Sequence, residues 1–259
     1  IPDDVIFRFF KKSDELEKIE KALKGIEENI KSLSEMNLKE LNIELTFEQQ
    51  ELFRKYYEFL IQENKKYNLT AITNEEEVYY KHFYDSLTLI KTNLIKEGVS
   101  LCDIGSGAGF PGIPLKIIYP NLKLTIVESQ TKKTEFLKKL VNFLELDNVE
   151  IINKRAEEYA HTKYFDIVTA RAVADLSILN ELCLPLVKKG GYFIAMKGNY
   201  EEELKRTLNG INILGGKLIE VLSFELPKEM GKRNLIIIKK EKMVQGYPRA
   251  FSQIKKKPL

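Results

Sequence analysis

Cysteine, histidine and long apolar runs are scarce in this 259-residue chain, and each scarcity excludes a class of protein. Cys102 and Cys183 are the only cysteines, and both stand in apolar segments, so we expect a reducing cytoplasm rather than a disulfide framework. The two histidines lie far from the cysteines, so no zinc or other metal site is expected. No apolar run approaches the length of a membrane span, and the charged N-terminal segment is unlike a secretion signal.

Positive charge gathers toward the C-terminal end of the chain. The formal net charge is only +3, but from Lys232 onward nine Lys and Arg residues stand against Glu241 alone. That segment therefore carries +8 and the remainder of the chain −5. A basic end on an acidic body is what electrostatic capture of a polyanion requires, and a solvated lysine-rich tail is the alternative.

Composition divides the chain into four parts. Residues 1–44 predict a charged helical extension, 45–97 a helical lobe, 98–242 an α/β domain and 243–259 a basic tail. In the lobe, Thr46 is a good N-cap for a helix to about Gln62, and a second helical stretch covers about 75–96. The extension carries a narrow apolar stripe over residues 16–33, for which either a second copy or the protein's own body would serve as partner. Its members are Leu16, Ile19, Leu23, Ile26, Ile30 and Leu33.

Strand and helix patterns alternate through the α/β domain, which predicts a mostly parallel sheet with helices on both faces. The predicted strands are 99–104, 122–128, 149–153, 165–170 and 191–196, and the predicted helices are 111–119, 131–145, 175–187 and 200–211. Two further strands, at about 217–226 and 234–240, follow each other with no helix between them. They predict an antiparallel hairpin at the end of the domain, as in the Rossmann-like sheet of methyltransferases that use S-adenosylmethionine (SAM).

The segment Leu101–Pro114 predicts a buried strand, a glycine loop and the start of a helix. It carries two overlapping patterns: Asp103 followed by Gly105, Gly107 and Gly109, typical of SAM binding, and the dinucleotide spacing that ends at Gly112. In the dinucleotide pattern the first glycine follows the strand directly, whereas here it comes late. The carboxylate of Asp103 also suits the cationic amino-acid end of SAM better than a pyrophosphate.

Two later features bear on the choice of cofactor. Glu128 ends the next predicted strand, where its carboxylate could accept both hydroxyls of an adenosine ribose in either cofactor. The segment 186–196 predicts a helix end, a tight glycine turn and a fifth strand, a layout common in SAM-dependent methyltransferases. Together with the final hairpin it favours SAM, and a dehydrogenase remains as an alternative.

Several segments of the chain, in order, resemble one family over about residues 45–249: the bacterial RsmG (GidB) methyltransferases, which methylate N7 of a guanine in 16S ribosomal RNA. The segments that carry the resemblance are 64–73 (NKKYNLTAIT), 81–86 (KHFYDS), 103–114 (DIGSGAGFPGIP), 155–157 (RAE), 169–174 (TARAVA), 182–186 (LCLPL) and 247–249 (YPR). Residues 1–44 match no part of the family known to us, and the end of the chain lacks a Gly-x-Pro step found in many members. The resemblance implies a SAM-dependent RNA methyltransferase of the small ribosomal subunit.

Carried over position by position, the family's SAM contacts fall on Gly105, Phe110, Ala156, Glu157 and Arg171. The Phe110 ring could cover part of the ligand, and the Arg171 guanidinium could orient the SAM carboxylate or an RNA phosphate. Guanine N7 has a free lone pair and no proton to lose, so the resemblance implies a proximity mechanism without a general base.

Three residues of the lobe invite a role in this site. His82 is the alternative candidate for a base, and we interpret it instead as a packing or hydrogen-bonding residue. Asp85 and Ser86 are expected to brace the glycine loop from the lobe.

The implied substrate needs a basic rim around the site. Our candidates are Lys65, Lys66, Lys197, Arg249 and the terminal lysines, because splayed RNA presents phosphates and unstacked bases. The resemblance favours an assembled small subunit over naked RNA as substrate. Methylation of another RNA site, and a SAM- or RNA-binding module without catalysis, are the competing functions.

Overall fold

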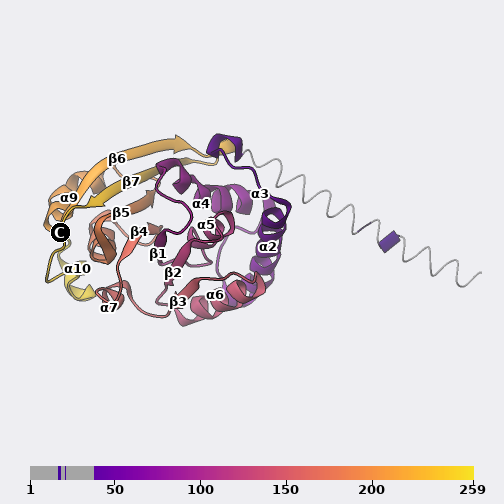
Figure 1. The fold of residues 1–259 in the computed structure, drawn as a ribbon, viewed down its shortest axis with the longest axis horizontal. Helices are drawn as coiled ribbons and strands as arrows, with labels where there is room; N and C mark the ends of the chain where they lie inside the picture. The colour runs from indigo at the N-terminus through magenta and orange to yellow at the C-terminus, as the bar shows by residue number, and fades with distance from the viewer. Residues whose placement is uncertain (1–16, 19–20, 22–37) are drawn as a thin grey trace, which may run out of the picture. The chain divides into compact units, whose positions relative to one another are not determined.

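A seven-stranded sheet is the centre of the part of the chain that the structure, a computed structural model, describes: residues 17, 18, 21 and 38–259 (Figure 1). Its order is β3-β2-β1-β4-β5-β7-β6. The strands are β1 (Ser100–Ile104), β2 (Lys123–Val127), β3 (Val149–Ile152), β4 (Phe165–Arg171), β5 (Val187–Lys197), β6 (Gly216–Glu225) and β7 (Lys232–Lys240). The first five pair in parallel and β7 runs antiparallel to β5 and β6, so the predicted mixed sheet with a terminal hairpin is confirmed.

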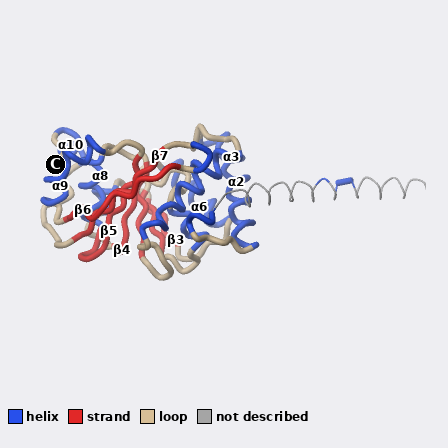
Figure 2. Tube along the Cα trace, turned by 90° about the horizontal axis from the view of Figure 1, so that it is seen from above, coloured by secondary structure: helices blue, strands red, loops and turns tan. Residues whose placement is uncertain are grey.

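Helices cover both faces of this sheet, as its parallel strands require (Figure 2). The helices of the α/β part are α5 (Gly112–Ile118), α6 (Thr131–Phe143), α7 (Ala156–Tyr159), α8 (Leu176–Cys183), α9 (Glu201–Ile213) and α10 (Phe251–Lys256), with short 3₁₀ turns η4 (Leu184–Leu186) and η5 (Pro227–Glu229). Helices α8, α9 and α10 lie on one side of the sheet, and α6 lies with the helical lobe on the other.

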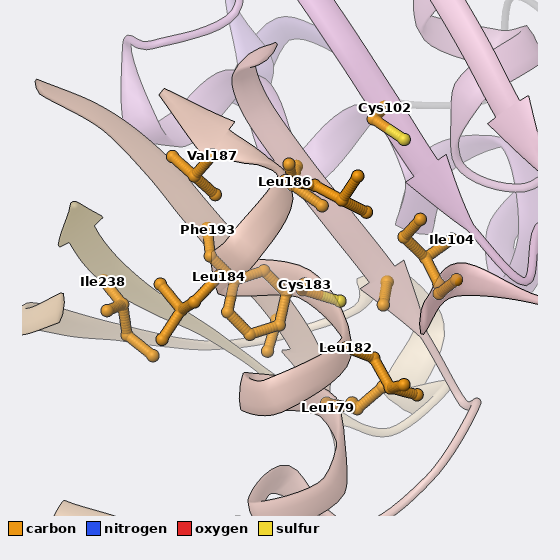
Figure 3. Packing of buried hydrophobic residues seen from close by; sticks show 14 of the residues in the cluster. Cys102, Ile104, Leu179, Leu182, Cys183, Leu184, Leu186, Val187, Phe193 and Ile238 are labelled. Atoms are coloured by element: carbon orange, nitrogen blue, oxygen red, sulfur yellow. The ribbon is translucent and has the colours of Figure 1, made fainter. Parts of the chain in front are cut away.

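Apolar side chains from β1, β4, β5 and β7 meet α8 in a core that excludes water (Figure 3). Ile104, Leu179 and Phe193 are each at most 3% exposed there. Cys102 and Cys183 are also free and buried in this core, and burial raises the pKa of both thiols well above the usual value. Both cysteines therefore act as small apolar side chains of this core.

The helical lobe starts with α2 (Phe47–Tyr67), capped by Thr46 as predicted. The Thr46 side chain accepts from the Gln49 amide and the Gln49 side chain accepts from the Thr46 amide, a capping box. The helical stretch predicted over about 75–96 is observed from Glu75 to Thr92 as four consecutive pieces: α3 (Glu75–Val78), η2 (Tyr79–Tyr84), α4 (Asp85–Leu87) and η3 (Thr88–Thr92). The η2 piece is a π-helix, a widened turn often found at functional sites.

Both ends of the compact unit are packed into it. The unit spans Leu38–Leu259, because Leu38 and Leu41 of the short turn η1 (Leu38–Leu41) are buried in it. The basic tail is also part of the unit: Ile254 of α10 is fully buried, and Leu259 packs against Gly210 of α9. The apolar stripe of residues 16–33 lies outside the described residues.

Candidate functional site

Three glycines with positive φ shape the loop between β1 and α5. The φ angle is +69° at Gly105, +62° at Gly107 and +106° at Gly109, a region that other residues rarely adopt. A Cβ at Gly109 would lie 2.5 Å from the Tyr56 hydroxyl, whereas one at Gly107 would meet nothing within 4 Å. Gly109 therefore allows the lobe to pack on the loop, and Gly107 leaves an open face that a ligand can approach.

Asp103, near the end of β1, braces this loop from below. Its Oδ2 accepts hydrogen bonds from Ser106 Oγ (2.6 Å) and from the Gly112 amide (2.8 Å). Its Oδ1 is buried and has no hydrogen-bond partner among the described residues. Burial raises the pKa of this carboxyl to about 6. A buried acceptor oxygen without a donor fits a cationic group such as the ammonium of SAM.

The ends of β2 and β3 lie beside β1 at the same edge of the sheet. Glu128 follows β2, is 4% exposed, and accepts a hydrogen bond from the Gly107 amide at its Oε2 (3.2 Å). Asn153 follows β3 and donates from its side chain to the Glu128 carbonyl (3.1 Å). Ala156 and Glu157 then begin α7, the former buried and the latter half-buried. The residues after β2 and β3 that were predicted to bind SAM therefore lie at the carboxyl-terminal edge of the sheet, where parallel sheets bind ligands.

Phe110 joins the glycine loop to the helical lobe. Its ring is 4% exposed and stacks on Tyr56 (centroids 5.4 Å apart) and on His82 (4.5 Å). The ring is therefore a buried contact between the loop and the lobe, and its role as a cover for part of the ligand stays a prediction. Tyr56 also donates from its hydroxyl to the Ala108 carbonyl (2.6 Å), which supplies the brace expected from Asp85 and Ser86.

Arg171, at the end of β4, is held by the lobe through an ion pair. Its Nη1 donates to Asp85 Oδ2 (2.9 Å) and to the Lys81 carbonyl (3.2 Å), and its guanidinium carbon lies 5.0 Å from the centre of the Phe110 ring. Arg233, at the start of β7, donates to the other Asp85 oxygen (3.0 Å). Asp85 therefore holds two guanidinium groups from two strands, which was not anticipated from the sequence.

His82 is a neutral packing residue in this arrangement, in keeping with the interpretation from sequence. Its Nε2 lies 2.9 Å from Thr70 Oγ1, and its Nδ1 lies 3.3 Å from Arg171 Nη2. Burial, and then the charge of Arg171, lowers the pKa of His82 to about 3. Ser86 bonds the carbonyl of His82 on the preceding turn and does not reach the glycine loop.

A cavity of about 500 Å³ lies where β4 and β5 end and the lobe begins. Its wall consists of Ile72, Lys81, His82, Asp85, Arg171, Ala172, Met196, Lys197, Gly198, Asn199, Glu203 and Arg233. Two predicted site residues, Arg171 and Lys197, meet here, whereas Lys65, Lys66 and Arg249 do not line it. No sequence motif marks Glu203 or Arg233 as a site residue. Glu203 lies here because it follows β5 in the chain, and Arg233 because it lies at the start of β7, the second strand of the hairpin.

Lys197 is tied into the wall of this cavity. Its Nζ donates to the Ala174 carbonyl (2.9 Å) and forms an ion pair with Glu203 Oε2 (2.7 Å). The same Glu203 oxygen accepts from the Leu176 amide (2.8 Å). Lys197 therefore links the ends of β4 and β5 to α9, and its side chain is only 12% exposed.

Arg249 has a structural partner that the sequence did not reveal. Its guanidinium donates to both oxygens of Glu181 (2.8 and 2.6 Å), and the Glu181 side chain is fully buried in α8. This bidentate pair anchors the tail to the body of the protein. Arg249 does not line the cavity, and its Nε and Nη2 are engaged by Glu181, so its role toward RNA stays a prediction.

Lys65 and Lys66 are exposed at the end of α2. Lys66 forms an ion pair with Glu63 (2.6 Å), and the adjacent Tyr67 hydroxyl accepts from Lys139 of α6 (2.8 Å). These lysines therefore belong to the α2 and α6 side of the unit.

Two features are absent from residues 17, 18, 21 and 38–259. No cluster of His, Cys, Asp and Glu suited to a metal ion occurs among them. Within the same residues, no helix is both long and apolar enough to cross a bilayer.

The sheet order, the antiparallel β7, the glycine loop after β1 and the acidic residue after β2 together define the class of SAM-dependent methyltransferases. Among solved structures, a mutant of MtNAS shares the fold, with a TM-score of 0.51, 15% identity and coverage of 73% of this chain and 74% of that one.

The chain belongs to the family described as "GidB: rRNA small subunit methyltransferase G", whose model matches residues 49–236. A curated relative from Staphylococcus saprophyticus, named ribosomal RNA small subunit methyltransferase G, is 54% identical over 84% of this chain and 93% of its own length. A relative of the same name from Lactobacillus helveticus is 49% identical over 86% of this chain and 97% of its own.

Proposed function

We propose that this chain transfers the methyl group of SAM to N7 of a guanosine in the 16S ribosomal RNA of the small subunit, in the bacterial cytoplasm. Membership of the GidB family is the observation that carries the proposal. The geometry supports it, because a loop with an open face at Gly107 and a separate cavity beside Arg171 provide places for a donor and an acceptor.

The residues around the glycine loop fit the donor. Asp103 would hold the ammonium of SAM through its unpartnered oxygen, Glu128 would accept the ribose hydroxyls, and Ala156 and Glu157 would address the adenine edge. When bound, SAM supplies a methyl group already activated by the sulfonium. Arg171 is proposed to orient the donor's carboxylate, with Asp85 holding the guanidinium in position.

The chain's own contribution to the reaction is alignment. Guanine N7 attacks through a lone pair, so no residue has to remove a proton before methyl transfer. His82 suits this mechanism, since its ring is engaged by Thr70 and its low pKa keeps it neutral near pH 7. Holding N7 in line with the methyl group is the effect that a rigid pocket supplies.

The exposed lysines are proposed as the surface that meets the RNA. Lys65 and Lys66 remain candidates, together with the exposed Lys255, Lys256 and Lys257 of the tail. Lys197 and Arg249 are engaged by carboxylates, so we assign them to holding the site and the tail together. A surface of separated lysines recognises phosphate positions, and we propose that the assembled small subunit, rather than free RNA, presents them correctly.

The test is a methylation assay with the full chain. Radiolabelled SAM is incubated with assembled small subunits or with free 16S RNA, and the product is digested for nucleoside mass spectrometry. We expect 7-methylguanosine, with at least tenfold more label in subunits. Equal labelling of free RNA would contradict the preference for subunits, and another methylated nucleoside would indicate another RNA site.

A thermal-shift measurement separates the remaining alternatives. A melting temperature raised by SAM without any methyl transfer would indicate a binding module, because a ligand of the folded state stabilises it. A shift with NAD and none with SAM would indicate a dehydrogenase.

A further inference from the structure

The cavity beside Arg171 has the size and position for an extruded nucleotide. Enzymes that modify a base in RNA take it out of its stack and contact its Watson–Crick edge. Because N7 must face the methyl donor, the opposite edge of the guanine faces the cavity wall. That edge presents two donor groups, N1–H and the N2 amine, so the wall has to offer an acceptor.

Two carboxylates line this cavity, Asp85 and Glu203. Both oxygens of Asp85 already accept a hydrogen bond, Oδ1 from Arg233 (3.0 Å) and Oδ2 from Arg171 (2.9 Å). Its side chain is only 3% exposed. A guanine therefore has little access to the Asp85 carboxylate.

Glu203 differs from Asp85 because only one of its two carboxylate oxygens accepts hydrogen bonds from the protein. Its Oε2 accepts from the Leu176 amide (2.8 Å) and pairs with Lys197 Nζ (2.7 Å). Among residues 38–259, no hydrogen bond to Oε1 is found, and the side chain, which is 25% exposed, lines the cavity. The carboxylate is therefore held in one orientation while its second oxygen stays available.

We propose that Glu203 recognises the acceptor guanine by accepting hydrogen bonds from its N1–H and N2 amine. This inference rests on the proposed function and names the residue that selects the base. Adenine has an acceptor at N1, so it would place a lone pair against the carboxylate and be rejected. Lys197 and the Leu176 amide act as positioning groups, because they fix the carboxylate without touching the base.

The test removes one hydrogen-bonding group from the base, the N2 amine of guanine, and one from the protein, the accepting oxygen of Glu203. The methylated guanosine is first located in wild-type product, and small-subunit RNA is then ligated with inosine, which lacks the N2 amine, at that position. Wild type and Glu203→Gln are assayed on both RNAs after assembly into subunits. The amide of Gln is isosteric but turns a donor toward N1–H.

For wild type, kcat/KM should be about ten- to a hundredfold lower with inosine than with guanosine, as expected for a hydrogen bond to a charged group. Glu203→Gln should lower kcat/KM for guanosine by a similar factor and reduce the guanosine-to-inosine ratio to within about twofold. Glu202→Gln is the matched control: Glu202 is exposed on the same turn, pairs with Lys205 (3.1 Å), and should leave the ratio unchanged.

Two results would overturn the proposal. One is a wild-type enzyme that methylates inosine as fast as guanosine, a measurement that needs no variant to fold. The other is a Glu203→Gln enzyme that is slower on both RNAs but keeps the wild-type ratio, which is what loss of the Lys197 anchor alone would produce. Failure of wild type to methylate any guanosine would instead refute the proposed function.

Discussion

Replacing His82 by Gln should make the stability of this protein less sensitive to acid. Burial lowers the pKa of His82 to about 3 in the folded protein, whereas a histidine in an unfolded chain titrates near 6.5. Below pH 6.5 the unfolded chain therefore binds a proton that the folded protein refuses. The stability contributed by the neutral His82 is complete above pH 6.5 and is lost progressively as the pH falls toward 3.

The size of the effect follows from these two pKa values. At pH 4.5 the unfolded histidine lies about two pH units below its pKa, which corresponds to about 2.7 kcal/mol of lost stability. Because the ring is not fully buried, we expect about 2 kcal/mol. Glutamine also loses the stacking on Phe110 and the contact with Thr70, a penalty of about 1–2 kcal/mol at every pH. The variant should thus be less stable than wild type at pH 7.5 and equal to it or more stable at pH 4.5.

Urea unfolding at constant ionic strength, from pH 7.5 to 4.5, measures this difference. The pH dependence of wild-type stability cannot be assigned to His82 alone, because titration of Asp103 changes the free energy of unfolding in the opposite direction. Burial raises the pKa of Asp103 to about 6, so its stabilising contribution is complete below pH 3.8 and is lost as the pH rises through 6. The difference between variant and wild type cancels that effect. The exposed His161 provides the control, His161→Gln, and a His82→Gln difference that stays constant within about 0.5 kcal/mol would refute the reasoning.

Four further substitutions test other contacts. Gly107→Ala should destabilise the protein by about 1 kcal/mol and abolish the thermal shift with SAM. Gly109→Ala should destabilise it by about 3 kcal/mol, because the added methyl group clashes with the lobe. Equal losses of stability would contradict the assignment of Gly109 to lobe packing and of Gly107 to an open face. Arg249→Ala should cost about 2–4 kcal/mol in chemical unfolding, because Glu181 is left buried without its partner, and an unchanged midpoint would argue against the anchor. Asp85→Asn should lower kcat more than it raises KM, because two guanidinium groups lose their anchor; a change in KM alone would exclude this role.

The sheet could be predicted because its signals are local. Each strand of the α/β part is a short apolar run between turn residues, and the observed strands β1–β4 lie within one residue or so of the predicted ranges. The fifth strand was predicted from 191 but starts at Val187, which pairs with Phe165 of β4, because the residues before Gly191 were assigned to a helix end and a glycine turn. The cap at Thr46 and the positive φ of the loop glycines likewise depend on neighbouring residues alone.

The acceptor cavity could not be predicted in the same way, because its contacts join residues far apart in the chain. Asp85 meets Arg171 and Arg233 across 86 and 148 positions. The π-helical turn of η2 was also hidden, since the apolar pattern of residues 75–96 fits an ordinary helix. Arg249 was assigned to RNA from its charge, and only the fold shows that a buried carboxylate takes up that charge.

The pairing of charges in the cavity fits the proposed reaction. Arg171 and Arg233 share Asp85, and Lys197 pairs with Glu203, so each of these cations faces a carboxylate. Methyl transfer moves a positive charge onto the purine, and unpaired guanidinium groups around the base would oppose that step. Attraction of the RNA is better supplied at a distance, by exposed lysines whose field reaches the phosphates without raising the potential at the base. The predicted basic residues accordingly separate in the structure: Arg171 and Lys197 pair with carboxylates at the cavity, whereas Lys65, Lys66 and the tail lysines are exposed, where we propose that they attract RNA.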